Sequence, residues 1–414
     1  MKRIAVIGSG ISGLASAYLL SQHAHVTLYE KNARIGGHSR TIEVDYHGVT
    51  IPVDTGFIVF NHTTYPNLVA LFTKLKVATE KSDMSFSFAT DRGHFEWGAK
   101  SLNTLFAVRR NLFSPSFYRM IHDIAHFFNK SESVVAAQPD LTLEGLIKHM
   151  NLSRTFCDRF LLPMGAAIWS SSPIQMLAFP AESFVRFFRN HGLLSFSGQH
   201  QWYTVTGGSQ EYIKKLVKSI QHIRLACSVV SIDTSGKLPR VVTNNGDEQS
   251  YDEIVIAAHA DEALAIIDTA TAQEQAVLTA FSYQVNTAYL HCDTSIMPKR
   301  KSCWASWNYH GDGKENVAIT YWMNSLQNID MRYPLFVTLN PLEPIKPDNV
   351  FNIHSFTHPV FTTESIAAQQ EIPKIQGKRK LWFCGAYQRN GFHEDGLWSA
   401  MRVVQMMGLS IPWP

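Results

Sequence analysis

Residues 4–20 read IAVIGSGISGLASAYLL, and this stretch decides the fold. Its first four residues, Ile4 to Ile7, form a short apolar run of the kind that buried parallel strands show. The small and apolar residues from Ser12 to Ser21 predict a packed helix soon after it. The glycines between strand and helix follow the pattern G-x-G-x-x-G, which in this context predicts a dinucleotide-binding strand–turn–helix unit.

Each glycine of the pattern has its own physical reason. Gly8 permits the tight turn, Gly10 lets the backbone approach a pyrophosphate, and Gly13 lets the helix pack close to the strand. The backbone amides at the start of the helix, at Ile11 and Ser12, then face the phosphates. The pattern alone is weak evidence, because glycine clusters also mark ordinary turns.

An acidic residue strengthens the dinucleotide interpretation. His25 to Tyr29 predicts the second strand, and Glu30 follows at its end. A carboxylate in that place can accept hydrogen bonds from the ribose hydroxyls and disfavours a 2′-phosphate. We therefore expect a dinucleotide that lacks this phosphate.

A second glycine turn distinguishes FAD from NAD. Glu30 to Thr41 reads EKNARIGGHSRT, so glycines and cations directly follow the acidic residue, placed to hold the pyrophosphate from its other side. A plain NAD domain needs no such element. The stretch resembles the flavin amine oxidase superfamily, whose usual form is an acidic residue, three further residues, R-x-G-G-R and then Thr. His38 stands where that family usually has Arg, so we expect a phosphate contact that is weaker or depends on pH.

The C-terminal part of the chain supports the same resemblance. Leu381 to Gly385 reads LWFCG, and Gly396 and Leu397 open a predicted helix. The resemblance implies that this strand reaches the ribityl chain, that the helix start faces the flavin ring, and that the backbone of Asp54 to Gly56 approaches the ring. The predicted FAD contacts are Gly8, Gly10, Ile11, Ser12, Gly13, Glu30, Lys31, Arg34, Gly36, Gly37, His38, Ser39, Asp54, Thr55, Gly56, Val229, Gly385, Gly396 and Leu397.

Three further stretches narrow the resemblance. They are Asp54 to Pro66 (DTGFIVFNHTTYP), the Gly207-Gly208 turn, and Gly391 to Leu397 (GFHEDGL). Together they are similar to the FAD-binding proteins that accompany, or are fused to, cyclopropane-fatty-acid synthases. That likeness implies a redox enzyme acting on a lipid acyl chain, with a lipid methyltransferase as its partner.

Candidates for catalysis lie just before the C-terminal helix. His393 and Glu394 form the best titratable group near the expected ring, and either is a candidate general base. The alternative is that Glu394 or Asp395 caps the helix. No metal-ligand pattern appears among the five cysteines, none of which stands in a C-x-x-C pair, and their odd number fits a reducing cytoplasm.

The order of predicted elements gives an α/β fold with two interleaved lobes. We expect an FAD-binding domain with a Rossmann-type parallel sheet from residues 1–60, 200–265 and 375–414. We expect a substrate domain, an antiparallel sheet with helices, from residues 61–199 and 266–374. In the second lobe the predicted strands include 284–292, 303–308, 317–323 and 335–339.

Composition limits the partners. The net charge of +3 over 414 residues argues against nucleic acid. Residues 102–128 and 183–196 are rich in phenylalanine with interspersed arginine, so they could lie on a membrane surface; the alternative is that they form the core face of ordinary helices. We expect a cytoplasmic protein, with surface membrane association under the first interpretation.

These observations together predict an FAD-dependent oxidoreductase of the oxidase or desaturase type. The expected substrate is apolar, namely a lipid acyl chain or a small molecule. One alternative is a flavin amine oxidase proper, although no lysine stands in the strand positions where such enzymes place one near the flavin. Another is a non-redox FAD-binding partner of a lipid methyltransferase.

Overall fold

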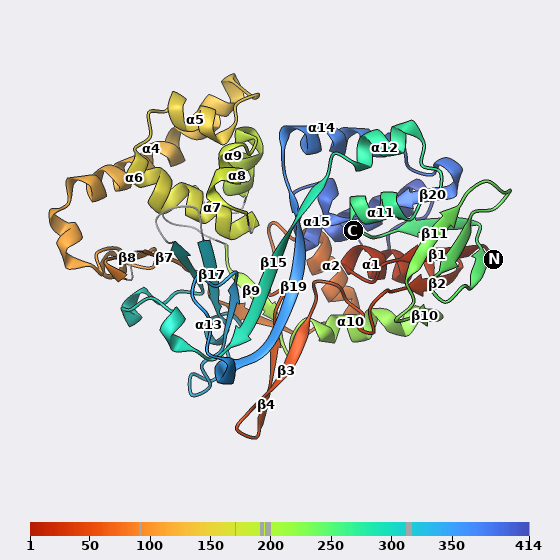
Figure 1. Cartoon of the computed structure of the whole chain (residues 1–414), viewed down its shortest axis with the longest axis horizontal. Helices are drawn as coiled ribbons and strands as arrows, with labels where there is room; N and C mark the ends of the chain where they lie inside the picture. Colours follow the sequence, from red (N-terminus) through yellow and green to blue (C-terminus); the bar gives the residue numbers. More distant parts are fainter. Residues whose placement is uncertain (91–92, 170, 191–193, 195–199, 312–316, 414) are drawn as a thin grey trace.

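A parallel sheet with strand order β10-β2-β1-β14-β20 forms one lobe of the computed structural model (Figure 1). Its strands are β1 (Arg3–Ile7), β2 (His25–Tyr29), β10 (His222–Arg224), β14 (Glu253–Ile256) and β20 (Leu381–Phe383). The structure describes residues 1–90, 93–169, 171–190, 194, 200–311 and 317–413. The strands come from distant parts of the chain, so this lobe is assembled from three segments.

Helices cover both faces of the parallel sheet. On one face Val6 and Leu28 pack with helices α1 (Ile11–Leu20), α2 (Pro66–Leu75), α10 (Gln210–Leu216) and α15 (His393–Met406). On the other face Ala5 and Ile256 pack with α11 (Ala260–Ala265), α12 (Ala272–Leu278) and α14 (Thr363–Glu371). Helices α2, α12 and α14 thus pack with the parallel sheet although they come from segments expected in the substrate domain.

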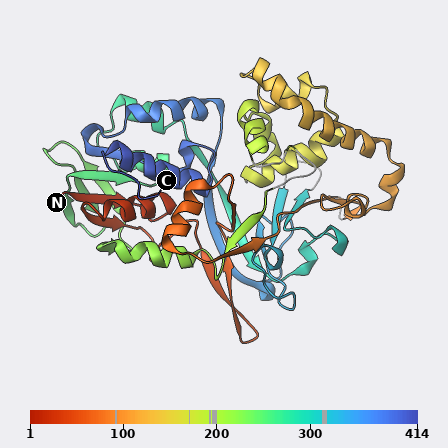
Figure 2. The same cartoon turned by 180° about the vertical axis from the view of Figure 1, so that it is seen from behind.

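The second lobe is built on a long, mostly antiparallel sheet. Among the described residues its order is β19-β15-β18-β17-β16-β7-β8. The strands are β7 (Phe86–Thr90), β8 (Phe95–Gly98), β15 (Ser282–His291), β16 (Trp307–Gly311), β17 (Val317–Trp322), β18 (Phe336–Leu339) and β19 (Val350–Val360). Figures 1 and 2 show β15 and β19 running side by side between the two lobes, so this strand pair connects them. The α/β fold with a parallel and an antiparallel sheet is confirmed.

Helices pack on one side of the second lobe, at the upper left of Figure 1. They are α3 (Leu102–Leu105), α4 (Pro115–Ala137), α5 (Leu143–His149), α6 (Arg154–Phe156), α7 (Leu162–Trp169), α8 (Pro173–Leu177) and α9 (Ala181–Asn190), and α13 (Met323–Leu326) lies by the sheet. Most of the phenylalanines expected here are core residues: Phe117, Phe127, Phe184 and Phe188 are fully buried. Phe196 lies outside the described residues.

Smaller strands complete the chain. They are the hairpin β3 (Thr41–Tyr46) and β4 (Val49–Asp54), the sheet of β5 (Val59–Asn61), β6 (Thr79–Ser82) and β9 (Trp202–Val205), and the sheet of β11 (Val229–Asp233), β12 (Arg240–Thr243) and β13 (Glu248–Ser250). At the end of β4 the buried Asp54 accepts hydrogen bonds from Thr41 Oγ1 (2.6 Å), from the backbone N–H of Ser209 (2.9 Å) and from Gln327 Nε2 (3.2 Å). Asp54 therefore ties the hairpin to the start of α10 and to the second lobe.

Two expected boundaries are wrong. The strand expected at 303–308 begins only at Trp307, because the Asn308 side chain bonds both the N–H and the C=O of Ala305 and holds a turn there. The C-terminal helix begins at His393 rather than Gly396, because the Asp395 carboxylate accepts the backbone N–H groups of Phe392 and Asn390. The strand β19 was not expected.

Glu394 caps a neighbouring helix rather than its own. Its carboxylate accepts the backbone N–H groups of Asn67 and Leu68, each at 3.0 Å, and the Asn67 side-chain amide at 2.6 Å. These donors belong to the first turn of α2, which has no intrahelical partners for them. Glu394 therefore holds the N-terminus of α2 against α15.

The first prediction concerns this cap. The Glu394→Ala variant leaves two buried backbone donors without an acceptor, so we expect the free energy of unfolding to fall by about 1–3 kcal/mol. Chemical denaturation of the holoprotein measures it. The matched control is Glu144→Ala in the exposed first turn of α5, which should cost roughly 0.5 kcal/mol or less. Unchanged stability with lost turnover would instead assign Glu394 to catalysis.

Candidate functional site

Two glycine turns meet at the carboxyl end of the parallel sheet. A Cβ on Gly37 would lie 2.9 Å from the Cα of Gly10, and the N–H of Gly36 donates to Ser9 Oγ at 3.1 Å. A Cβ on Gly10, in contrast, would meet no atom within 4 Å. This open space, the crevice, therefore lies directly beside the start of α1, where a bound anion would face the first backbone amides.

Glu30 lies beside this space. Its carboxylate accepts hydrogen bonds from the backbone N–H (3.0 Å) and the hydroxyl (2.6 Å) of Ser9. It also accepts them from the backbone N–H (2.8 Å) and the side-chain amide Nδ2 (2.9 Å) of Asn32. The two backbone donors fix the carboxylate, while the two side-chain donors can rotate away when a ribose hydroxyl takes their place. The sequence analysis did not single out Ser9 or Asn32, because neither stands at a motif position.

Arg34 holds the second glycine turn together. Its guanidinium donates to the carbonyl oxygens of Ser39 (2.9 Å), Ile35 (3.2 Å) and Gly37 (2.5 Å). Lys31 is exposed and pairs with Glu262 at 2.5 Å. Val229 is buried at the start of β11. The structure thus gives Arg34 and Lys31 protein partners, and their contact with FAD stays a prediction.

His38 is the polar side chain most enclosed in this crevice without a partner. Its ring lies 4.9 Å from the Phe356 ring and 5.2 Å from the His358 ring, and its Nε2 is buried with no hydrogen bond to the described residues. Burial, and then the nearby His358, His259, His393 and His354, hold the pKa of His38 well below its usual value. A partly exposed imidazole whose Nε2 has no partner among the described residues fits a site for an anionic phosphate.

The start of α15 packs against the start of α1. A Cβ on Gly396 would lie 2.7 Å from Ile11 Cγ2, and Ser12 Oγ donates to the Gly396 carbonyl at 2.9 Å. Nearby, the N–H of Gly385 donates to Ser399 Oγ at 2.9 Å, and Leu397 is fully buried. Two helix N-termini therefore meet at one place, which makes the local potential positive.

The Asp54 to Gly56 segment reaches the same crevice. A Cβ on Gly56 would lie 2.1 Å from the carbonyl oxygen of His38, which also accepts the N–H of Phe57 at 2.9 Å. Thr55 is buried and donates to the carbonyl of Arg40 at 3.2 Å. The structure therefore brings the predicted segments 8–13, 36–39, 54–56 and 396–397 together around one crevice.

His393 lies in the first turn of α15 and contacts the 36–39 and 54–57 segments. Its ring stacks on Phe57 at 3.9 Å, and its Nε2 lies 2.8 Å from the hydroxyl of Tyr212 and 3.4 Å from that of Ser39. Burial lowers the pKa of His393 to about 3, so the imidazole is neutral at pH 7. Phe57 and Tyr212 were missed by the sequence analysis.

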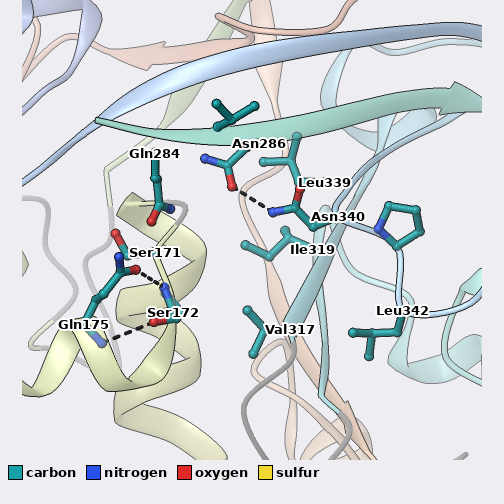
Figure 3. A pocket seen from close by; sticks show the side chains of 13 residues that line it. Ser171, Ser172, Gln175, Gln284, Asn286, Val317, Ile319, Leu339, Asn340 and Leu342 are labelled. Atoms are coloured by element: carbon teal, nitrogen blue, oxygen red, sulfur yellow. Dashed lines mark hydrogen bonds between the residues drawn. The ribbon is translucent and has the colours of Figure 1, made fainter. Parts of the chain in front are cut away.

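A cavity of about 500 Å³ lies between the helices and the sheet of the second lobe (Figure 3). The described residues that line it carry amides, hydroxyls and aliphatic side chains, and none of them is charged: Ala166, Ser171, Ser172, Gln175, Gln284, Val285, Asn286, Val317, Ile319, Leu339, Asn340, Pro341 and Leu342. Asn286 also bonds His358 at 2.9 Å, and His358 neighbours His38. One amide of the cavity wall therefore contacts a histidine that neighbours His38.

The described part of the chain holds neither a metal-binding cluster nor a membrane-spanning helix. No group of three His, Cys, Asp or Glu side chains there is arranged to hold a metal ion, and the histidines around His38 form no such group. None of the helices described has the length and hydropathy needed to cross a bilayer.

Comparison with known proteins places this fold. Residues 11–339 match the model of the flavin containing amine oxidoreductases. The chain shares its fold with a conjugated-linoleic-acid (CLA)-producing fatty acid isomerase from P. acnes, with a TM-score of 0.70 and 13% identity over 99% of both chains. It also shares it with the cyclohexylamine oxidase from Brevibacterium oxydans IH-35A, with a TM-score of 0.67 and 14% identity over 99% of this chain and 100% of that one.

A curated relative matches over a short stretch only. The mitochondrial protoporphyrinogen oxidase of Nicotiana tabacum is 49% identical over 45 residues, which are 11% of this chain and 9% of the tobacco protein. The family model, in contrast, covers most of the chain and includes the start of α1, the second glycine turn and the cavity strands β15, β17 and β18. The chain is thus an FAD-dependent oxidoreductase and belongs to the flavin containing amine oxidoreductase family.

Proposed function

We propose that this enzyme oxidises an apolar substrate, a lipid acyl chain, which binds in the cavity beside the crevice. The observation that carries the proposal is the lining of that cavity, whose described residues combine aliphatic side chains with neutral amides and include no carboxylate. An aliphatic chain gains free energy by leaving water for such walls. A cationic amine would lose its hydration there and meet no opposite charge.

FAD, when bound, takes a hydride equivalent from a substrate C–H bond. Loss of a proton from the neighbouring carbon then leaves a double bond, so a desaturation also needs a proton acceptor. We assign this role to His393, because its imidazole is neutral at pH 7 and partly exposed beside Phe57. Glu394 is a poorer candidate, since three N–H donors already occupy its carboxylate.

Proteins that share this fold act on more than one class of substrate. One structural neighbour is titled a fatty acid isomerase, and another is titled a cyclohexylamine oxidase, so the fold alone allows both substrate classes. The sequence resemblance to proteins that accompany cyclopropane-fatty-acid synthases favours the acyl chain. On the same ground we propose a lipid methyltransferase as the partner.

The second prediction tests the substrate. Anaerobic mixing of the holoprotein with phospholipids bearing unsaturated or methyl-branched acyl chains should bleach the flavin absorbance, whereas primary amines should not. The variant His393→Gln should keep its FAD content and lose at least about tenfold in the bleaching rate. Bleaching by amines alone would overturn the lipid proposal. Co-purification with a lipid methyltransferase without bleaching by any lipid would indicate a non-redox role.

The third prediction concerns His38 and pH. The pKa of this imidazole is below its usual value in the protein without cofactor, and contact with the FAD pyrophosphate would raise it. The complex then holds more protons than the free protein, so FAD affinity should increase by up to about tenfold per unit as pH falls from 8 to 6. Quenching of FAD fluorescence by the apoprotein measures the affinity.

The arginine variant provides the control for this effect. His38→Arg keeps a positive charge at every pH, so it should bind FAD at pH 8 at least as tightly as the native protein does at pH 6. Its affinity should vary little between those values. A slope that persists in His38→Arg would assign the proton to another histidine of the crevice, such as His358, His259, His393 or His354.

An exposed apolar group near α3 offers a route to a lipid surface. Phe113 is 87% exposed and Leu102 76% exposed, and the exposed Arg109 and Arg110 lie between them in the sequence. Apolar side chains next to cations are typical of surfaces that insert into anionic membranes. We therefore propose that this end of the second lobe contacts the membrane that holds the substrate.

The fourth prediction tests this surface. Phe113→Asp replaces the apolar ring that would insert into the bilayer with a carboxylate. Affinity for phosphatidylglycerol vesicles should therefore fall by at least about tenfold. Vesicle co-sedimentation measures the binding. The control Met331→Asp changes an exposed apolar residue on another part of the second lobe and should have no such effect. Equal binding by both variants would exclude this surface.

A further inference from the structure

A row of side-chain amides connects the cavity to a histidine beside the cofactor crevice. Asn340 and Asn286 line the cavity and bond each other at 2.7 Å, as the dashed line in Figure 3 shows. Asn286 is 2% exposed and also bonds Nδ1 of His358 at 2.9 Å. His358 lies on β19, opposite Gln284 of β15.

The direction of every hydrogen bond in this row follows from one backbone group. The N–H of Thr287 donates to Asn340 Oδ1 at 2.9 Å, and a backbone N–H can only donate. Asn340 therefore presents its Nδ2 to Asn286 Oδ1, and Asn286 in turn presents its own Nδ2 to His358. Exchanging the O and N of either amide would put donor against donor.

This order decides where His358 carries its proton. Because Nδ1 accepts the hydrogen bond from Asn286, a neutral ring has its proton on Nε2. Burial, and then the nearby His259, lower the pKa of His358 to about 4, which agrees with a neutral ring at pH 7. The side chain is therefore an uncharged hydrogen-bond donor.

The donor atom remains available. The Nε2 of His358 has no partner among the described residues, and unlike Nε2 of His38 it is not enclosed by protein. Nε2 does not point at Asn286, because the hydrogen-bonding directions of the two imidazole nitrogens, which flank Cε1, diverge widely in the ring plane. The His358 ring itself lies 5.2 Å from the His38 ring.

We propose that Asn286 is a positioning residue that holds His358 as a neutral Nε2–H donor, and that this donor binds an uncharged carbonyl oxygen where the cavity meets the crevice. The oxygen comes either from the flavin ring or from the head of an acyl substrate. A neutral donor suits a neutral acceptor, since neither partner brings an uncompensated charge into a buried site. Only the second source rests on the proposed function.

The fifth prediction uses Asn286→Asp in the holoprotein. A carboxylate can only accept, so it should draw the proton to Nδ1 of His358 and raise the pKa of that ring by about one unit or more. Long-range ¹H–¹⁵N spectra of protein labelled with ¹⁵N-histidine report the tautomer and the pKa of each ring. The His358→Gln variant identifies the signals of His358. Should Asn286→Asp fail to fold, Asn340→Ala removes the bond that fixes the Asn286 amide, which can then flip. This variant should give a mixture of both tautomers of His358.

A charge control separates this effect from a general one. Gln175→Glu brings a carboxylate to the same cavity from α8, away from the amide row, and should leave the proton on Nε2 of His358. A native protein with the proton on Nδ1, or with a charged His358 ring at pH 7, would overturn the proposal.

Two further measurements identify the acceptor. With the flavin as acceptor, Asn286→Asp should change the absorption spectrum of bound FAD in the absence of any ligand. With the substrate as acceptor, that spectrum stays unchanged and the affinity for methyl oleate, measured by thermal shift, should fall about tenfold. No change in either would overturn the proposal. Because methyl oleate binding needs no turnover, these results stand even when no lipid bleaches the flavin.

Discussion

The close approach of α1 to β1 is the constraint on which the rest of the structure depends. A Cβ on Gly13 would lie 1.8 Å from the carbonyl oxygen of Gly8, and one on Gly8 would lie 2.5 Å from that of Ala257 in the segment after β14. Only glycine allows this packing, and φ of +97° at Gly8 also favours it. The start of α1 is thereby fixed at the carboxyl end of the sheet. Gly396 then lets α15 bring a second helix start to the same point.

The electrostatic character differs between the crevice at the start of α1 and the cavity of the second lobe. The crevice favours an anion, and the cavity favours neutral groups. The crevice has two helix N-termini and buried imidazoles, all of which favour negative charge or a neutral acceptor. The cavity beyond β15 and β19 has amides and aliphatic side chains. Asn286 belongs to both regions, since it lines the cavity and bonds His358. One buried amide therefore links the cavity wall to His358.

Local motifs made the cofactor side predictable from the sequence. Gly8, Gly13, Gly36 and Gly37 lie where a Cβ would clash, and their patterns predicted the two glycine turns. The approach of segments 54–56 and 396–397 followed from the resemblance to the flavin amine oxidase superfamily. The substrate side offered no such pattern. The strand β19, which was not expected, alternates Asn352, His354, Phe356 and His358 along an edge of the sheet, where Pro359 is tolerated.

Glu394 shows why residue type and position alone do not decide a role. A carboxylate beside the expected flavin ring suggests a base, yet its partners come from α2, more than three hundred positions earlier in the chain. Only tertiary packing reveals them, because no local pattern marks Asn67 or Leu68 as donors that need an acceptor. The same holds for the cavity. Its described lining residues come mostly from α7, α8, β15, β17 and β18, so the cavity forms only when these segments meet.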